Sequence, residues 1–162
     1  MCDHSENPVT FCLAGVGHSF EQERSGRILP MERIRKMKLI IGGAFQGKKK
    51  FAETLTGIPA GQFADGLVCE KEAVFEQPVI CHYHEYERRK LEKNQDTTTL
   101  VHEILKKNPD LVIISNELGY GVVPTGQFDR HYRETTGRIC TQAAAAAEEV
   151  YRVVCGIPTR IK

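Results

Sequence analysis

Short apolar runs recur along the later part of the chain, each about as long as one strand. They lie at residues 38–41, 79–82, 111–114 and 150–154. Runs of this length, with few polar interruptions, are typical of strands that are covered on both faces of a parallel sheet. The sequence therefore predicts a strand at each of these places.

The segments between these runs have the features of helices. Residues 48–55 place apolar side chains at i, i+1 and i+4 and are followed by Gly-Ile-Pro, which favours a helix with a defined end. Further helices are predicted over 85–93, 100–107 and 126–149. We expect Asp96 to cap the helix at 100–107, and we assign the charges of 85–93 to the solvent-exposed surface.

The region between residues 61 and 78 has a weaker pattern, with a short strand expected at 67–69 and a helical turn at 70–76. Strands that alternate with helices in this way predict an α/β fold with a mostly parallel sheet flanked by helices. Ligands of such sheets lie beyond the carboxyl ends of the strands.

The first 36 residues lack a regular apolar period, and we interpret residues 1–36 as a disordered N-terminal extension. We expect residues 37–162 to form one globular domain. Met37 directly precedes the first predicted strand, which makes it an alternative start of translation.

The overall charge offers no general attraction for polyanions. The 162 residues include 22 basic and 21 acidic side chains, a formal net charge of +1. This balance argues against nucleic acid or an anionic membrane as the main partner. No apolar run approaches the ~20 residues that a membrane span needs.

The six cysteines are scattered, without the spacing of a disulfide scaffold. We expect reduced thiols and a cytoplasmic protein. Cys81 lies near two histidines but has no second thiol at zinc-site spacing, so we expect no metal site.

A phosphate-loop motif lies between the first predicted strand and the first predicted helix, the context that this motif requires. Its residues are Gly42, Gly43, Ala44, Phe45, Gln46, Gly47, Lys48 and Lys49. Backbone N–H groups of such a loop surround phosphate oxygens, and the lysine at position 48 reaches the terminal phosphates. We therefore expect ATP or GTP at this loop, the alternative being a glycine-rich turn with surface lysines.

The motif departs from its usual form at its last position. A Ser or Thr there binds Mg²⁺ through its hydroxyl, whereas this chain has Lys49, which cannot ligate a cation. We expect Mg²⁺ to accompany the nucleotide but to be held in another way, or weakly.

Polar residues Ser115, Asn116 and Glu117 directly follow the predicted strand at 111–114. They should emerge at the ligand edge of the sheet, where Glu117 could contact Mg²⁺, a ribose or a guanine edge. The alternative is that Asn116 and Glu117 only satisfy the backbone of a turn.

Residues 115–124, with the sequence SNELGYGVVP, resemble the S-N-E-[VL]-G-x-G-[IV]-V-P signature of the adenosylcobinamide kinase / adenosylcobinamide-phosphate guanylyltransferase family. The resemblance continues to residue 162 and includes the phosphate loop, but it is poor between 53 and 110. It implies a P-loop NTPase-like fold, a homo-oligomer and a corrinoid substrate. The implied function is bifunctional: phosphorylation of adenosylcobinamide and then transfer of GMP from GTP in cobalamin biosynthesis.

In that family, the second reaction proceeds through a guanylylated histidine in a segment that this chain lacks. His82 and His84 are the histidines that follow a predicted strand end, and on an extended strand they would share one face. We therefore take them as candidate nucleophiles, alongside Lys48 and Glu117 as catalytic candidates. The alternative is an ordinary polar turn after a core strand.

Three functions remain open at this point. The first is a cobalamin-pathway enzyme with one or both activities. The second is a nucleotide-binding protein of the same family that has lost its chemistry, which Lys49 and the missing histidine segment favour. The third is a P-loop kinase of another small molecule.

Overall fold

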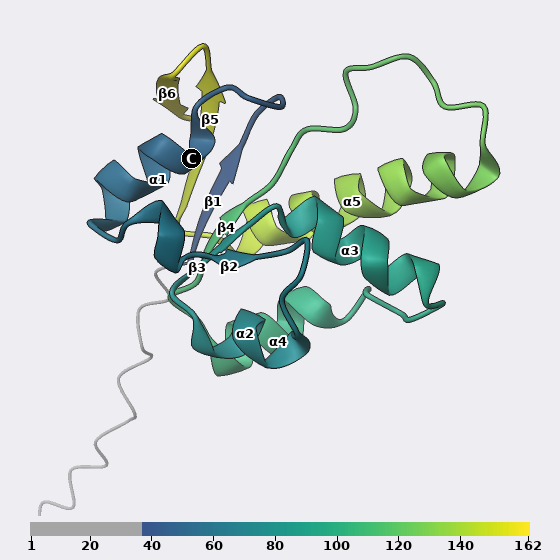
Figure 1. The fold of residues 1–162 in the computed structure, drawn as a ribbon, viewed down its shortest axis with the longest axis horizontal. Helices are drawn as coiled ribbons and strands as arrows, with labels where there is room; N and C mark the ends of the chain where they lie inside the picture. Colours follow the sequence, from purple (N-terminus) through teal and green to yellow (C-terminus); the bar gives the residue numbers. More distant parts are fainter. Residues whose placement is uncertain (1–36) are drawn as a thin grey trace, which may run out of the picture. The chain divides into compact units, whose positions relative to one another are not determined.

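A computed structural model of the chain describes residues 37–162, which form a six-stranded sheet with helices on both faces (Figure 1). The strands are β1 (Lys38–Ile41), β2 (Ala64–Asp65), β3 (Val79–Cys81), β4 (Val112–Ile114), β5 (Glu149–Val154) and β6 (Ile157–Arg160). Their order across the sheet is β2-β3-β4-β1-β5-β6, and every neighbouring pair is parallel except β5 and β6. The predicted α/β class with a mostly parallel sheet is confirmed.

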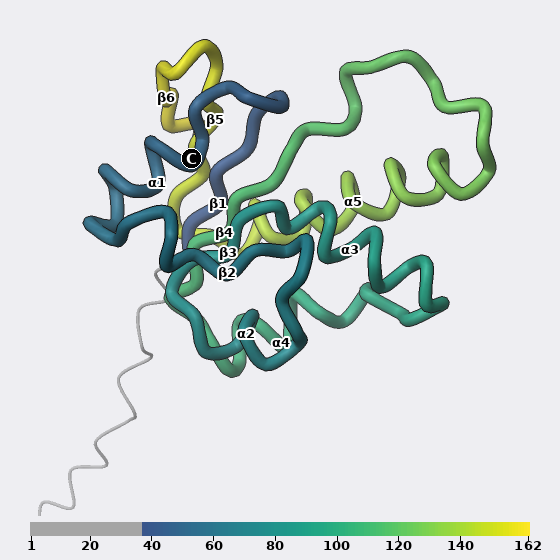
Figure 2. The backbone as a smooth tube through the Cα atoms, viewed as in Figure 1, coloured from purple at the N-terminus to yellow at the C-terminus, as the bar shows by residue number. Residues whose placement is uncertain are grey.

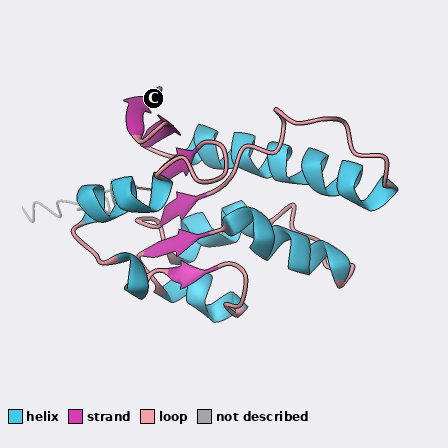
Figure 3. Cartoon of the chain, turned by 45° about the horizontal axis from the view of Figure 1, so that its top comes forward, coloured by secondary structure: helices cyan, strands magenta, loops and turns pink. Residues whose placement is uncertain are grey.

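The helices are α1 (Lys48–Thr56), α2 (Lys71–Glu76), α3 (Tyr83–Glu92), α4 (Leu100–Lys107) and α5 (Gln127–Ala146), with a short 3-10 helix at Ala60–Gln62. Side chains alternate across β1, so that Leu39 packs toward α2, α3, α4 and α5 while Ile40 packs toward α1. Figure 3 shows the strands between these two layers. Both faces are therefore covered, which explains the uninterrupted apolar runs of the strands.

Strand β1 lies between β4 and β5, with Leu39 opposite Ile113 on one side and opposite Val150 on the other. Because these strands are parallel, their carboxyl ends meet at one edge of the sheet. The segments that follow β1, β3 and β4 all emerge there, and this edge holds the candidate site.

The short strand expected at 67–69 was wrong, because β2 is Ala64–Asp65. The backbone turns sharply after Asp65, whose carbonyl accepts hydrogen bonds from the N–H groups of Val68 and Cys69 at 3.0 and 2.8 Å. Its carboxylate also accepts one from the Leu67 N–H at 3.0 Å. These local bonds satisfy the backbone of 67–69 without a strand partner.

The cap of one helix and the end of another also differ from the prediction. Helix α4 has Thr99 as its N-cap residue, because Asp96 instead accepts a hydrogen bond from the Thr98 N–H within the preceding turn. Helix α5 ends at Ala146 rather than at 149, since Glu149 already pairs with Lys38 of β1.

The chain's last strand was not predicted. After β5, Cys155 and Gly156 adopt positive φ values of 50° and 80°, and the chain returns as β6 in an antiparallel hairpin. The Gly156 N–H donates to the carbonyl of Gln46 in the phosphate loop at 3.0 Å. Figure 2 shows this hairpin beside the loop that follows β1.

The sequence had suggested that all charged side chains of 85–93 lie at the surface, but one of them does not. Glu87 is fully buried, and both of its carboxylate oxygens lack a hydrogen-bond partner among the described residues. Burial raises the pKa of Glu87 to about 7. The remaining charged residues of 85–93 are partly or fully exposed, as expected.

None of the helices described between residues 37 and 162 is long and apolar enough to cross a membrane. The expectations for residues 1–36 lie outside the described residues.

Candidate nucleotide-binding site

The phosphate loop connects β1 to α1 and requires glycine at two of its positions. Gly42 has φ 151°, and a Cβ added there would lie 2.3 Å from the carbonyl oxygen of Val153 on β5. Gly47, directly before α1, has φ 87°, and an added Cβ would lie 3.2 Å from the Cα of Gly156. The glycines of the motif thus allow both the turn and its close contact with β5 and the hairpin.

Lys48 begins α1 and is buried, with its ammonium turned back into the loop. Its Nζ donates hydrogen bonds to the carbonyls of Gly42 and Gly43 at 3.1 and 2.6 Å. Burial lowers the pKa of Lys48, and the negative charge of Glu117 opposes this effect. The ammonium is therefore held inside the loop by two backbone carbonyls.

Glu117 follows β4 and is joined to the same loop. Its N–H donates to the Gly42 carbonyl at 3.1 Å. Its carboxylate pairs with Arg152 of β5, with Nε at 3.2 Å from Oε1 and at 3.3 Å from Oε2. The Arg152 guanidinium in turn lies over the ring of Tyr120 at 5.1 Å. Glu117 is thus at the predicted sheet edge, but its charge is already balanced by an arginine.

A cavity of about 570 Å³ opens at this edge. It is lined by the loop and start of α1, by both candidate histidines and by the end of β4, namely Ala44, Phe45, Gln46, Gly47, Lys48, Lys49, Lys50, His82, His84, Ile114 and Asn116. Glu117 instead lines a neighbouring cavity of about 190 Å³, together with Arg133 and Cys140. Asn116 lines both cavities.

The sequence had suggested that His82 and His84 share one face of an extended strand, but they do not. Strand β3 ends at Cys81, His82 adopts φ 51° as the N-cap residue of α3, and the helix begins at Tyr83. The ring centroids of the two histidines are 6.2 Å apart. Both side chains still line the large cavity, although from the start of a helix.

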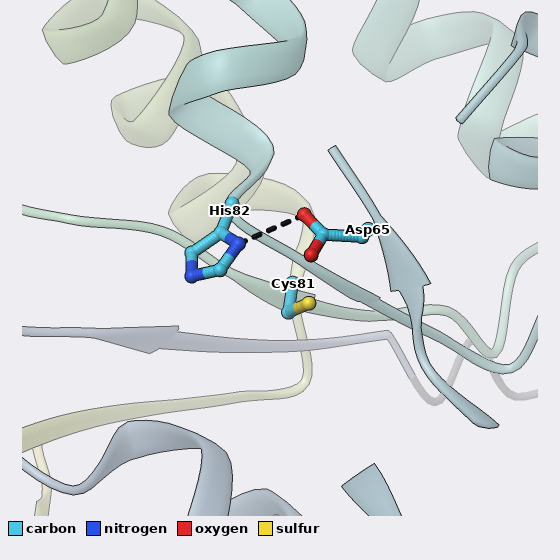
Figure 4. A group of neighbouring side chains, drawn as sticks. All are labelled: Asp65, Cys81 and His82. Atoms are coloured by element: carbon cyan, nitrogen blue, oxygen red, sulfur yellow. Dashed lines mark hydrogen bonds and ion pairs between the residues drawn. The ribbon is translucent and has the colours of Figure 1, made fainter. Parts of the chain in front are cut away.

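His82 is oriented by a carboxylate that the sequence analysis did not single out. Its Nδ1 lies 2.8 Å from Oδ1 of Asp65, at the end of β2 (Figure 4). Burial acts to raise the pKa of Asp65, but hydrogen bonds from His82 and from the Leu67 N–H outweigh it, so that the pKa is below its usual value. The ionised carboxylate can only accept, so Nδ1 donates, and in the neutral form of the imidazole the lone pair is on Nε2.

His84 is almost fully buried, and both of its ring nitrogens face Asn116. Nδ1 accepts a hydrogen bond from the Asn116 backbone N–H at 3.3 Å, and Nε2 lies 2.9 Å from the side-chain amide of the same residue. Burial, assisted by the charges of His82 and Lys48, lowers the pKa of His84 to about 4. His84 is therefore neutral at neutral pH and connects the start of α3 to the end of β4.

Ligand atoms of Asp65, Cys81 and His82 lie within 4.8 Å of one another, which is a grouping that could hold a metal ion (Figure 4). No metal site was predicted from the sequence, because Cys81 has no second thiol nearby and Asp65 lies on a strand that the pattern placed elsewhere. The Lys49 ammonium is a neighbour of the group, because its positive charge opposes the rise that burial causes in the pKa of Cys81. A metal ion would have to compete with this positive charge.

Comparison with known proteins gives a family and several relatives. A model of the family described as cobinamide kinase / cobinamide phosphate guanyltransferase matches residues 69–161. The bifunctional adenosylcobalamin biosynthesis protein CobU of Escherichia coli is 39% identical over 69 residues, which are 43% of this chain and 38% of that protein. The protein of the same name from Salmonella typhimurium is 46% identical over 52 residues, or 32% of this chain and 29% of that protein.

A third relative, the bifunctional adenosylcobalamin biosynthesis protein CobP of Pseudomonas aeruginosa, is 36% identical over 52 residues, which are 32% of this chain and 30% of that protein. The matches thus span between 29% and 38% of the lengths of these three relatives. The phosphate loop at 42–49 lies outside the part that the family model matches. The geometry of the loop and of Lys48 is therefore evidence independent of that match.

Proposed function

Because the chain belongs to the cobinamide kinase / cobinamide phosphate guanyltransferase family, we propose that it binds ATP or GTP and transfers phosphate and then GMP to a corrinoid. The observation that carries the proposal is the buried Lys48 ammonium inside a glycine loop that borders a cavity of about 570 Å³. We propose that the protein acts in the cytoplasm, in the assembly of cobalamin, with adenosylcobinamide as its substrate.

For the kinase step, the loop N–H groups and the start of α1 would hold the β- and γ-phosphates. Lys48 would exchange its bonds to the carbonyls of Gly42 and Gly43 for bonds to phosphate oxygens. A hydroxyl oxygen of the corrinoid would attack the γ-phosphorus, the bond to the bridging oxygen would break, and the nucleoside diphosphate would leave.

Glu117 is the carboxylate available at this edge. We propose that it contacts Mg²⁺, the ribose or a guanine edge of the nucleotide after it separates from Arg152, which now balances its charge. Mg²⁺ supplies charge neutralisation during phosphoryl transfer, and this chain offers it no hydroxyl at position 49.

For the guanylyl step, we propose His82 as the nucleophile in preference to His84. Its Nε2 lone pair would attack the α-phosphorus of GTP, a P–N bond would form, and pyrophosphate would leave. The phosphate of the phosphorylated corrinoid would then displace the imidazole and take the GMP group. Asp65 favours this role because its bond to Nδ1 keeps the proton away from Nε2.

His84 is less suited to the same chemistry. Its side chain is 3% exposed, and both ring nitrogens already face Asn116. We propose that it instead positions Asn116, which borders both cavities.

Incubation of the purified chain with GTP labelled at the α-phosphate tests the guanylyl proposal. We expect a covalent, acid-labile and base-stable adduct that His82→Ala abolishes and His102→Ala retains, since His102 is exposed on α4. A parallel incubation with ATP labelled at the γ-phosphate and adenosylcobinamide tests the kinase step.

The outcomes separate the candidate functions. Phosphorylation of adenosylcobinamide without an adduct would leave a kinase only. Nucleotide binding without either reaction would support a family member that has lost its chemistry, which is the reading that the Lys49 substitution favours. An adduct that persists in His82→Ala would contradict the choice of nucleophile.

A further inference from the structure

Lys49 occupies the position at which a phosphate loop ordinarily has its metal-binding hydroxyl. It lies in the first turn of α1, is half-buried, and lines the same cavity as Lys48. Its neighbour Lys50 differs, because that side chain is exposed and pairs with Glu53 at 3.2 Å. Both lysines line the cavity, but Lys49 is the less exposed of the two and has no such partner on its own helix among the described ion pairs.

The side chain of Lys49 has counter-groups at the ends of two strands. Burial raises the pKa of the Cys81 thiol, at the end of β3, and the positive charge of Lys49 opposes this effect. The same charge helps to keep the pKa of the Asp65 carboxylate, at the end of β2, below its usual value. Asp65 is in turn bonded to His82. The ammonium therefore lies near the ends of β2 and β3, beside the phosphate loop, before any nucleotide has bound.

A divalent cation and this ammonium would compete for one place. In a phosphate loop the hydroxyl at position 49 holds Mg²⁺ against the β- and γ-phosphates, where the metal neutralises phosphate charge. An ammonium on the same turn of α1 reaches the same oxygens, and a second cation beside it would be repelled.

We propose that Lys49 supplies the positive charge that a divalent cation supplies in other phosphate loops, so that this chain binds a nucleoside triphosphate without divalent metal. The inference rests on the nucleotide site of the proposed function and concerns binding alone. Phosphoryl transfer can still use Mg²⁺ held by the phosphates themselves.

The grouping of Asp65, Cys81 and His82 fits this inference better than a metal site of its own. Its ligand atoms lie within 4.8 Å of one another, but the positive charge of Lys49 acts on both Cys81 and Asp65 and would repel a metal ion there. We assign the carboxylate of Asp65 to balancing the charge of Lys49.

Calorimetric titration of the full chain with ATP and with GTP, in EDTA and in Mg²⁺, tests the proposal. For the unmodified chain we expect dissociation constants that agree within about threefold between the two conditions. Lys49→Ser restores the hydroxyl, so its affinity in EDTA should fall at least about tenfold, the loss of one charge-assisted hydrogen bond, and recover in Mg²⁺.

Two further variants keep the result interpretable. Lys49→Arg retains the charge and should retain binding in EDTA. Lys71→Ala removes a lysine that pairs with Glu103 outside the large cavity, and should bind as the unmodified chain does. Thermal unfolding of each variant verifies that it is folded.

Binding by the unmodified chain only in the presence of Mg²⁺, or equal binding in EDTA by Lys49→Ser, overturns the inference and leaves the nucleotide site standing. A requirement for another metal that Cys81→Ser abolishes overturns it in favour of a metal centre at Asp65, Cys81 and His82. If neither ATP nor GTP binds under any condition, the proposed function is overturned as well.

Discussion

Asp65 and His82 are joined by a hydrogen bond of 2.8 Å between Oδ1 and Nδ1, across the ends of two adjacent parallel strands. Asp65 ends β2, and His82 follows β3 in a left-handed conformation that begins α3. The register brings them together because Asp65 is opposite Cys81. The imidazole is thus oriented by a fixed element of the sheet.

Asp65→Asn should slow formation of the guanylyl adduct by about 100-fold or more, because an amide no longer favours the tautomer with a free Nε2 lone pair. The measurement is the single-turnover rate of labelling by α-labelled GTP. Asp110→Asn, at an exposed position, is the matched control and should label normally. Equal rates for Asp65→Asn and the unmodified chain would show that the hydrogen bond between Asp65 and His82 has a structural role only.

Lys48→Ala should weaken triphosphate binding by about 10- to 100-fold, because the variant lacks the ammonium that is directed into the loop. The variant should fold normally, since alanine favours a helix and the change removes a buried charge. Calorimetric titration measures the affinity, and the exposed Lys93 changed to alanine provides the control. Unchanged affinity would mean that the loop does not hold the phosphates.

Gly42→Ala should destabilise the fold by at least about 2 kcal/mol, because the new Cβ would lie 2.3 Å from the Val153 carbonyl oxygen. Urea unfolding measures the loss, and nucleotide binding should fall with it. Gly57→Ala is the informative comparison: its φ is also positive, at 72°, but no atom lies within 4 Å of the added Cβ. It should cost about 1–2 kcal/mol and leave nucleotide binding intact.

Glu87 should make stability depend on pH. Its pKa rises from the usual 4.5 to about 7 on folding. Its contribution to the free energy of unfolding is therefore fully present below about pH 4.5 and is lost as the pH rises to about 7. The shift corresponds to about 3 kcal/mol, and above pH 7 no further change is expected from this group.

Glu87→Gln tests this directly, because an amide mimics the protonated acid at every pH. The variant should gain stability relative to the unmodified chain as the pH rises from about 4.5 to 7, measured by urea unfolding at several pH values. Glu92→Gln, at an exposed position of the same helix, should show no such gain in stability with pH. A constant difference between Glu87→Gln and the unmodified chain would contradict the raised pKa.

Local pattern was enough to predict the elements that depend on neighbours in sequence. The glycines at 42 and 47 lie between an apolar run and a helical period, and the structure has the loop between β1 and α1 as expected. The polar residues at 115–117 emerge at the end of β4 for the same reason. Parallel pairing of short apolar strands then brings these segments to one edge.

Features set by distant contacts were not predictable from one sequence. The dyad of Asp65 and His82 depends on a two-residue strand that has no periodicity of its own. Glu87 lies in a run of charges that resembles a solvated surface, yet it is buried in the packing of α3. The contact of Gly156 with Gln46 joins positions at opposite ends of the domain.

That last contact has a consequence for how the protein matures during synthesis. The backbone N–H of Cys155 donates to the side chain of Gln46, across 109 positions of the sequence, and β5 supplies the carbonyl against which Gly42 lies. In a ribosome-bound chain whose β5 and β6 have not yet folded, the phosphate loop lacks the contacts that these strands make with Gly42 and Gln46. Nucleotide affinity should therefore arise only after the residues around 156 have left the exit tunnel.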